Sequence, residues 1–167
     1  MTADEVKKLL GLVPHPCEGG WFRRTYESGE RIAAEAFADR RYVGARLTGT
    51  AIYYLLEPGT FSEMHRLRSD EIFHFYAGDA VEMLQLDEQG SGRVVRIGNR
   101  LAEGEQPQIV VPRGVWQGSK LAPGGQWALL GCTVSPGFEY EDYEAGSCAE
   151  LCAAWPQFDV LIRELTR

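Results

Sequence analysis

Short apolar runs separated by turn residues recur along most of this sequence, and this pattern constrains the fold more than any other feature. About ten such runs lie between residues 21 and 135, at intervals of about 8 to 12 residues, and none has the length and period of a helix. Nineteen glycines and eight prolines are available to form the turns. A series of short strands at this spacing is typical of β-sandwiches and β-barrels. We therefore predict an all-β fold.

Two turns are predicted to be β-hairpins. Residues 81–86 alternate between apolar and polar side chains, and the polar segment 87–92 that follows is typical of a hairpin turn into a strand over residues 93–97. Gly78 and Asp79 form a two-residue turn of the Gly-X kind, which predicts a second hairpin just before residue 81.

Helices are predicted only at the two ends of the chain. Thr2 with Glu5, and Ser147 with Glu150, have the spacing of capping boxes, which predicts one short helix that ends at Gly11 and another that stops before Pro156. A last helix is predicted over residues 157–165, where apolar side chains recur on one face. No linker, repeat or low-complexity segment divides the chain, so residues 1–167 are predicted to form a single domain.

The charge balance limits the classes of partner. The formal net charge is −7 at pH 7, whereas nucleic acids and anionic membrane surfaces are bound by basic proteins, so we expect neither as a partner. No apolar run approaches the roughly 20 residues needed to cross a bilayer. Residues 1–12 are charged, unlike a signal peptide, and the four cysteines lack metal-binding spacing. We expect a cytoplasmic protein with reduced thiols.

The candidate chemistry is concentrated in residues 59–78, which hold two of the three histidines, His65 and His74, together with Glu71. A strand over residues 60–67 and a short turn bring Glu71 to the start of the next strand. A histidine and a carboxylate that point inward from facing strands can hold a metal ion or form an acid–base pair. His74 lies three residues after Glu71, so a regular strand directs it to the opposite face.

The spacing within this stretch resembles the first motif of the cupin superfamily. Five, one, three and six residues separate the motif positions Gly59, His65, Leu67, Glu71 and Gly78. A metal-binding cupin has a second histidine where this chain has a leucine.

Further segments resemble a family of small single-domain cupins of unassigned activity. They are Pro-His-Pro at residues 14–16, Glu-Gly-Gly at 18–20 with the Phe-Arg at 22–23, and residues 50–56, 131–134 and 136–139. Residues 112–117 resemble an altered form of the second cupin motif, in which Gln117 stands at the position of the motif histidine. The resemblance covers residues 9 to 165. It implies a cupin jelly roll, a β-sandwich that closes into a small barrel around an inward cleft.

The resemblance also indicates where a metal would bind. The four ligand positions of a metal-binding cupin correspond here to His65, Leu67, Glu71 and Gln117. Leucine cannot ligate, and glutamine offers only a neutral amide oxygen, so three ligands remain and two of them are oxygens. We therefore expect no cofactor, and a divalent metal held by His65, Glu71 and Gln117 is the alternative.

The same positions suit proton transfer. His65 beside Glu71 in an apolar interior is suited to act as a general base, with a tyrosine as proton donor. The implied fold is similar to that of the sugar-nucleotide 3,5-epimerases, which use a histidine, a carboxylate and a tyrosine without a metal. Tyr53, Tyr54 and Tyr76 are all candidates for the tyrosine.

We predict His65 and Glu71 as the catalytic residues, and a larger set that contacts a ligand: Arg23, Tyr54, His74 and Gln117. Arg23 belongs to the first strand, which we expect to place it at the barrel mouth, where it would pair with an anionic ligand.

The leading functional hypothesis is a protein that binds a small polar metabolite, sugar-like or anionic. Isomerase or epimerase chemistry with His65 as the base is a possible addition to binding, and the sequence leaves open whether the protein is an enzyme. The alternatives are a metal-dependent oxygenase or isomerase, and a non-catalytic metabolite sensor or binding module. The resemblance implies a homodimer. Residues 27–41, predicted to be a long loop, and the first strand are natural arms for strand addition across a two-fold axis.

Overall fold

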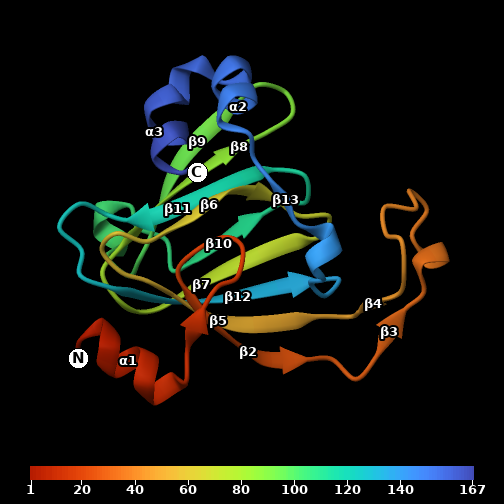
Figure 1. Cartoon of the computed structure of the whole chain (residues 1–167), viewed down its shortest axis with the longest axis horizontal. Coiled ribbons are helices and arrows are strands. Elements are labelled where there is room, and N and C mark those ends of the chain that lie inside the picture. Colours follow the sequence, from red (N-terminus) through yellow and green to blue (C-terminus); the bar gives the residue numbers. More distant parts are fainter.

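The computed structural model describes all 167 residues and confirms the all-β jelly roll, with two antiparallel sheets facing each other (Figure 1). One sheet has six strands, in the spatial order β1 (Val13–Pro14), β2 (Trp21–Glu27), β5 (Thr50–Leu56), β12 (Ala128–Ser135), β7 (Asp70–Gly78) and β10 (Gln108–Val111). The other has five strands, in the order β13 (Glu144–Ala145), β6 (Phe61–Arg66), β11 (Trp116–Leu121), β8 (Val81–Leu86) and β9 (Gly92–Ile97).

From β5 onward the chain crosses to the other sheet at every connection except the one between β8 and β9. That connection is the hairpin predicted over residues 87–92, and the pairing of Leu86 with Gly92 confirms it. The hairpin predicted at Gly78 and Asp79 is wrong, because β7 pairs with β10 and β12 while β8 pairs with β9 and β11. The turn is tight, with Gly78 at φ +94°, but it leads the chain between sheets.

The alternation between sheets determines where the candidate residues lie. β6 carries His65 in the five-stranded sheet, and β7 carries Glu71 in the six-stranded sheet, so the two residues come from opposite walls of the sandwich. Gln117 in β11 pairs with His65 in β6. The three residues that the cupin motifs single out therefore lie around one region between the sheets.

Three apolar clusters hold the layers together. The largest lies between the two sheets and includes Tyr54, Phe73, Met83 and Leu130. A second joins the five-stranded sheet to the C-terminal helices, and a third, around Leu55, joins the six-stranded sheet to the first helix. Burial of apolar area drives this packing, at roughly 25 cal/mol for each Å² removed from water.

The helices match most of the predictions. α1 (Ala3–Leu10) begins at the predicted capping box, in which Thr2 and Glu5 each bond the backbone of the other, and it ends at Gly11. α2 (Cys148–Ala154) has the Ser147 cap without the reciprocal bond from Glu150. The predicted last helix is divided into the 3-10 turn η4 (Pro156–Phe158) and α3 (Asp159–Glu164). None of the helices has the length and apolar character needed to cross a bilayer.

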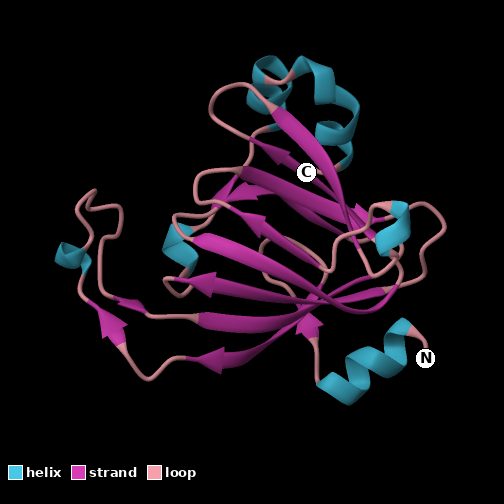
Figure 2. Ribbon diagram, turned by 180° about the vertical axis from the view of Figure 1, so that it is seen from behind, coloured by secondary structure: helices cyan, strands magenta, loops and turns pink.

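The segment predicted to be a long loop is an arm that projects from one end of the sandwich (Figures 1 and 2). β3 (Arg31–Ile32) and β4 (Arg46–Leu47) pair to form its base, and the 3-10 turn η1 (Ala34–Ala36) lies between them. Two further 3-10 turns, η2 (Leu101–Glu103) and η3 (Tyr140–Asp142), lie in other loops. The arm therefore has local structure that its weak sequence pattern did not predict.

Candidate functional site

A narrow pocket with a cavity volume of about 30 Å³ lies between the sheets, enough for about two water molecules. It is bounded by the inner face of the six-stranded sheet, by residues 14–20 before β2, and by residues 136–143 after β12. Most of the wall is apolar, and the polar groups include two carboxyl groups from different segments. The lining residues are His15, Glu18, Phe22, Arg24, Thr50, Ile52, Leu67, Glu71, Cys132, Val134, Phe138 and Tyr140.

Glu71 and Gln117 meet across the sandwich. The Gln117 Nε2 atom donates a hydrogen bond of 2.5 Å to Glu71 Oε2, and the two residues are only 1% and 7% exposed, respectively. Burial raises the pKa of Glu71 to about 7, against the opposing effect of the Gln117 hydrogen bond. A carboxyl group with a pKa near neutrality can both take up and release a proton.

His65 and Glu18 form a second buried pair. The Nδ1 atom of His65 lies 2.7 Å from the backbone carbonyl oxygen of Glu63, which can only accept, so Nδ1 carries a hydrogen. The other ring nitrogen, Nε2, lies 3.2 Å from Glu18 Oε2. His65 Nε2 and Glu18 Oε2 can therefore form a hydrogen bond that shares one proton.

Burial decides which of the two residues carries that proton. Loss of hydration lowers the pKa of His65 to about 4. Burial raises the pKa of Glu18 well above its usual range, and the nearby carboxylates of Glu71 and Glu63 raise it further. Both shifts favour a protonated Glu18 that donates to a neutral His65. The pocket thus holds a carboxylic acid beside the Glu71 carboxyl group.

Residues 14–20 fold over the pocket and bring Glu18 into it. The Nδ1 atom of His15 accepts from the backbone N–H groups of Cys17 and Glu18, at 3.4 and 3.1 Å, so its hydrogen lies on Nε2. Burial lowers the pKa of His15 to about 4, which keeps the ring neutral in this role. The Tyr54 hydroxyl donates to the carbonyl oxygen of Gly19 at 2.8 Å. These bonds fix the segment on the sandwich.

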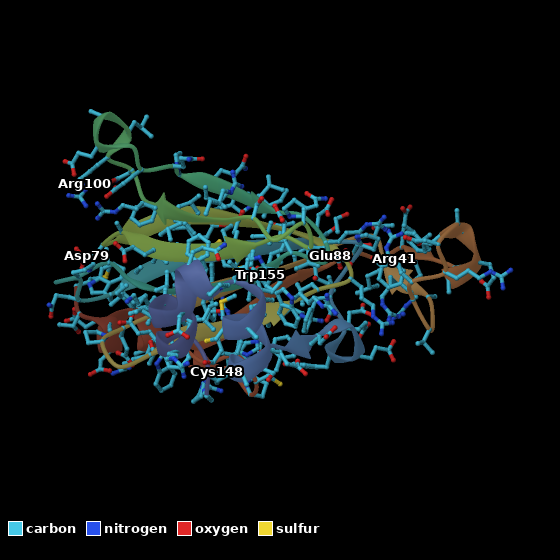
Figure 3. All side chains as sticks on the ribbon, turned by 90° about the horizontal axis from the view of Figure 1, so that it is seen from above. Arg41, Asp79, Glu88, Arg100, Cys148 and Trp155 are labelled. Carbon is cyan, nitrogen blue, oxygen red and sulfur yellow. The ribbon has the colours of Figure 1, made fainter.

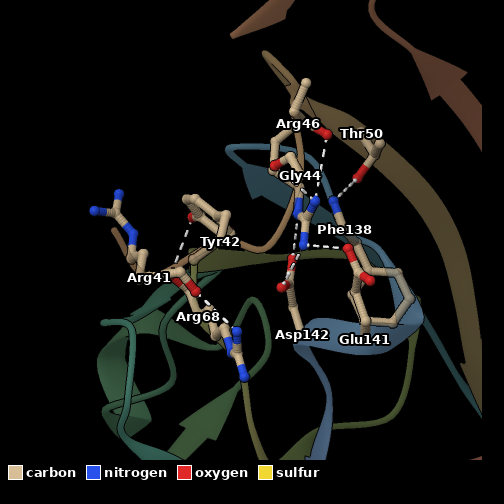
Figure 4. Close-up of polar contacts among 11 residues, drawn as sticks. Arg41, Tyr42, Gly44, Arg46, Thr50, Arg68, Phe138, Glu141 and Asp142 are labelled. Carbon is tan, nitrogen blue, oxygen red and sulfur yellow. Dashed lines mark hydrogen bonds and ion pairs between the residues drawn. The ribbon is translucent and has the colours of Figure 1, made fainter. Parts of the chain in front are cut away.

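A buried ion pair fixes the opposite side of the pocket mouth (Figure 4). Arg46 in β4 is 1% exposed and donates to both carboxylate oxygens of Asp142, at 2.7 and 2.8 Å. Thr50 Oγ1 accepts from the backbone N–H of Phe138 at 3.0 Å. The two contacts hold the loop over residues 136–143 so that Phe138 and Tyr140 line the pocket.

The tyrosine next to His65 is Tyr143. Its ring stacks on the imidazole with centroids 5.0 Å apart and planes 21° apart, and its hydroxyl donates to Glu63 Oε1 at 2.7 Å. Tyr54 is fully buried, with its hydroxyl bonded to Gly19. Tyr53 and Tyr76 contact each other, with ring centroids 6.0 Å apart, and neither lines the pocket.

Arg23 and His74 lie on the outer face of the six-stranded sheet. The guanidinium of Arg23 lies 5.5 Å from the ring centre of Tyr53, its partner in β5. His74 stacks near Tyr76 and contacts Thr133 at 3.3 Å. Contrary to our expectation, Arg23 does not lie at the pocket mouth, because the inner face of β2 carries its neighbour Arg24 instead.

Several residues of the site were not predicted, among them His15, Glu18, Arg24 and Tyr143. The first two lie in a loop, where hydrophobic periodicity gives no orientation, although the Pro-His-Pro and Glu-Gly-Gly segments were visible in the sequence. Arg24 could have been found only by knowing which face of β2 turns inward.

The side chains present do not fit a metal ion in this arrangement. No group of three His, Cys, Asp or Glu side chains converges on one ion position. The Nε2 atom of His15 carries its hydrogen, that of His65 is occupied by Glu18, and Leu67 stands where a cupin ligand would be. The Gln117 Oε1 atom is buried without a hydrogen-bond partner, but it is a single neutral donor.

A larger groove, of about 500 Å³, shares one lining residue, Leu67, with the narrow pocket. Arg41 and Glu88 on its walls lie toward the same end of the molecule, the end that carries the arm (Figure 3). Its lining is mostly charged, and neither Glu18 nor Glu71 belongs to it. The narrow pocket therefore remains the candidate site.

Comparison with known proteins identifies the family. Residues 4–146 match the family described as cupin superfamily (DUF985). An uncharacterized protein of Saccharomyces cerevisiae is 28% identical over 139 residues, which are 79% of this chain and 69% of the yeast protein.

Solved structures give the same result. A hypothetical protein from Leishmania major is 33% identical, with a TM-score of 0.88 and coverage of 99% of both chains. A protein of Shewanella oneidensis is 35% identical, with a TM-score of 0.85 over 100% of this chain and 98% of its own. Oxalate decarboxylase of Bacillus subtilis, a protein with Mn(II) centres, shares only the fold, at 16% identity and a TM-score of 0.53 over 92% of this chain and 36% of its own. The chain belongs to the cupin superfamily, in the family DUF985.

Proposed function

We propose that this cupin binds a small polar metabolite and moves a proton to and from one of its carbon atoms, as an isomerase or epimerase does. The observation that carries the proposal is the pair of carboxyl groups, Glu18 and Glu71, in one small, largely apolar pocket. Their surroundings differ: Glu18 is held as an acid against His65, whereas Glu71 has a pKa of about 7. Two carboxyl groups in different protonation states are a common acid–base arrangement.

In the proposed reaction, ionised Glu71 accepts the proton from carbon, and the proton of Glu18 goes to the oxygen that becomes negative. His65 touches Glu18 and does not line the pocket, so it acts as a positioning residue that sets the orientation and proton content of Glu18. This role replaces the direct base that we expected of His65 from the motif. Gln117 holds Glu71 in place through its amide.

The small volume of the pocket supports a reaction from which water is excluded during proton transfer. The cavity of about 30 Å³ is too small for a metabolite of several heavy atoms, so the substrate must displace part of the wall. Two wall segments lie outside both sheets, residues 15–20 and the loop over residues 136–143, and the first carries Glu18. Substrate binding that moves the segment carrying Glu18 would therefore reposition its carboxyl group at the same time as water leaves the pocket.

The test is deuterium incorporation from D₂O into carbon positions of candidate ligands, followed by NMR. A thermal-shift screen of keto sugars, sugar nucleotides and small organic acids first selects compounds that stabilise the protein. Glu71→Gln should abolish the exchange, and Glu18→Gln should reduce it by about 10²-fold or more, the usual contribution of a general acid. His74→Ala, on the outer face of the strand that carries Glu71, is the matched control and should retain full exchange.

The His65→Ala variant tests the positioning role. It should lower the exchange rate and alter its pH profile, because Glu18 loses the partner that fixes its proton. Binding without exchange for every compound that stabilises the protein would point instead to a non-catalytic binding module. Exchange that survives Glu71→Gln would refute the assignment of the base.

A further inference from the structure

Arg24 is the one arginine or lysine among the residues that line the acid–base pocket. It lies on β2 opposite Ile52, whose side chain also lines the pocket, and next to Phe22 on the same inner face. The other charged or titratable groups in the lining are the two carboxyl groups, the neutral His15, Cys132 and Tyr140. A guanidinium at this position is therefore the natural partner of any anionic group that enters.

The guanidinium has donors to spare. It has five N–H groups, and its only side-chain hydrogen bond joins Nη1 to Glu27 Oε1 at 2.7 Å. The side chain of Glu27 is 56% exposed, and that of Arg24 is 30% exposed, so this ion pair is solvated and weak. Arg24 can therefore bind a second anion, and weakening its ion pair with Glu27 would cost little free energy.

The immediate surroundings favour a planar anion. The rings of Phe138 and Tyr140 lie edge to face, 5.2 Å apart, and both line the pocket mouth near Arg24. Burial raises the pKa of Tyr140, and the charge of Arg24 acts against that rise, so the hydroxyl remains a neutral donor close to the guanidinium. Arginine binds a carboxylate through two parallel hydrogen bonds, and a carboxylate needs less room than a phosphate in a cavity of about 30 Å³.

We propose that Arg24 binds the carboxylate of the substrate, and that the substrate class is a small 2-oxo acid. The inference rests on the proposed acid–base function for the part of the substrate that reacts. With its carboxylate on Arg24 at the mouth, the next carbons of such an acid extend toward Glu71 and Glu18 inside. Arg23, the residue predicted from the sequence for this task, faces the other side of the sheet.

The reaction balances without another reactant. Glu71 takes a proton from C3, the C3–H electron pair forms the C2–C3 double bond, and the carbonyl electrons take the proton of Glu18 to give the enol. The reverse sequence returns a proton from Glu71 to C3 and the enol proton to Glu18. A proton is exchanged with solvent through Glu71, and a substituted C3 is inverted when the enol turns its other face to Glu71 before it is protonated.

The experiment compares two neighbouring arginines on opposite faces of β2. The probe is 2-oxobutanoate, with its neutral amide as the uncharged analogue, and binding is measured by calorimetry at constant ionic strength. The parent protein and Arg23→Gln should bind the acid equally, and Arg24→Gln should bind it at least about tenfold more weakly, since a charge-assisted pair is lost. The amide should bind all three proteins alike. Thermal unfolding checks that each variant is folded.

Several results would overturn the inference. They are no binding of 2-oxobutanoate to the parent at millimolar concentration, equal binding by Arg24→Gln, and an equal loss in Arg23→Gln. Tighter, Arg24-dependent binding of inorganic phosphate would replace the carboxylate with a phosphate group as the ligand.

The same samples separate this inference from the proposed function. Arg24-dependent binding of the acid without deuterium exchange at C3 supports the carboxylate site and contradicts the proton-transfer function. Exchange at C3 of 2-oxobutanoate that is the same in Arg24→Gln supports the function and contradicts the carboxylate site.

Discussion

The buried carboxyl group of Glu71 should make the stability of this protein depend on pH in a predictable direction. In the native state the group keeps its proton up to a pH of about 7, whereas in the unfolded chain it releases it near its usual pKa of 4.5. Between these values the native state binds more protons than the unfolded state, so the contribution of Glu71 to stability falls as the pH rises. It is fully present below pH 4.5 and lost through pH 7.

Glu71→Gln isolates this contribution, because an amide has nearly the shape of the protonated acid and does not titrate. The two pKa values correspond to about 3 kcal/mol, so the variant should gain up to about that much stability relative to the parent between pH 4.5 and pH 8. The figure is an upper value, since Glu71 also raises the pKa of Glu18. His15 and His65 titrate in both proteins, and their contributions cancel to first order in the difference.

The assay is urea unfolding followed by tryptophan fluorescence at a series of pH values from 5 to 8. Glu35→Gln is the control for the substitution itself, because Glu35 lies exposed in the arm and does not line the pocket. A Glu71→Gln difference that is constant over this range, or that falls as the pH rises, would refute the argument that burial holds the proton on Glu71.

Three further predictions concern the metal, the assembly and the arm. Elemental analysis of protein purified without an affinity tag should find far less than one equivalent of transition metal, and nearly one equivalent that disappears in His65→Ala would contradict this. Light scattering should give about twice the 18.6 kDa of one chain, and a mass near 18.6 kDa at micromolar concentration would exclude the dimer. Arg46→Met should lower the free energy of unfolding by about 3–5 kcal/mol, because Asp142 is left buried without a partner, and a loss below about 1 kcal/mol would show that the pair is dispensable.

The sequence predicted the fold because strand spacing and the cupin motif agree on one architecture. It also identified Glu71 and Gln117, whose hydrogen bond joins the two sheets. The alternation of side chains along a strand shows which residues share a face. In β2 both faces carry an aromatic residue and an arginine, so the sequence could not show which face turns toward the pocket. The turn at Gly78 was recognised as tight, while the sheet that receives the next strand depends on the whole topology.

Glu18 shows a different limit of sequence-based inference. Its distance from His65 depends on the path of residues 14–20, which is determined by a bond from the Glu18 N–H to His15 and by bonds from Tyr54 and the backbone N–H of Glu63. The bonds from Tyr54 and Glu63 join segments far apart in the chain, and no local pattern encodes them. A pocket assembled from one sheet and the loops beside it is therefore visible only in three dimensions.

The buried ion pair between Arg46 and Asp142 has a consequence for how this protein can change. Arg46 stands at the base of the projecting arm, and Asp142 belongs to the loop that carries Phe138 and Tyr140 to the pocket mouth. The base of the arm and the loop at the pocket mouth are therefore coupled, because a movement of Arg46 also moves Asp142 and its loop. Substitutions confined to residues 30–45, none of which lines the pocket, should alter which ligands enter it. If a second subunit bound the arm, it would also reduce the mobility of the loop at the pocket mouth. Evolutionary selection for dimer formation and for substrate range would then act on the same contacts, the hydrogen bonds between Arg46 and Asp142.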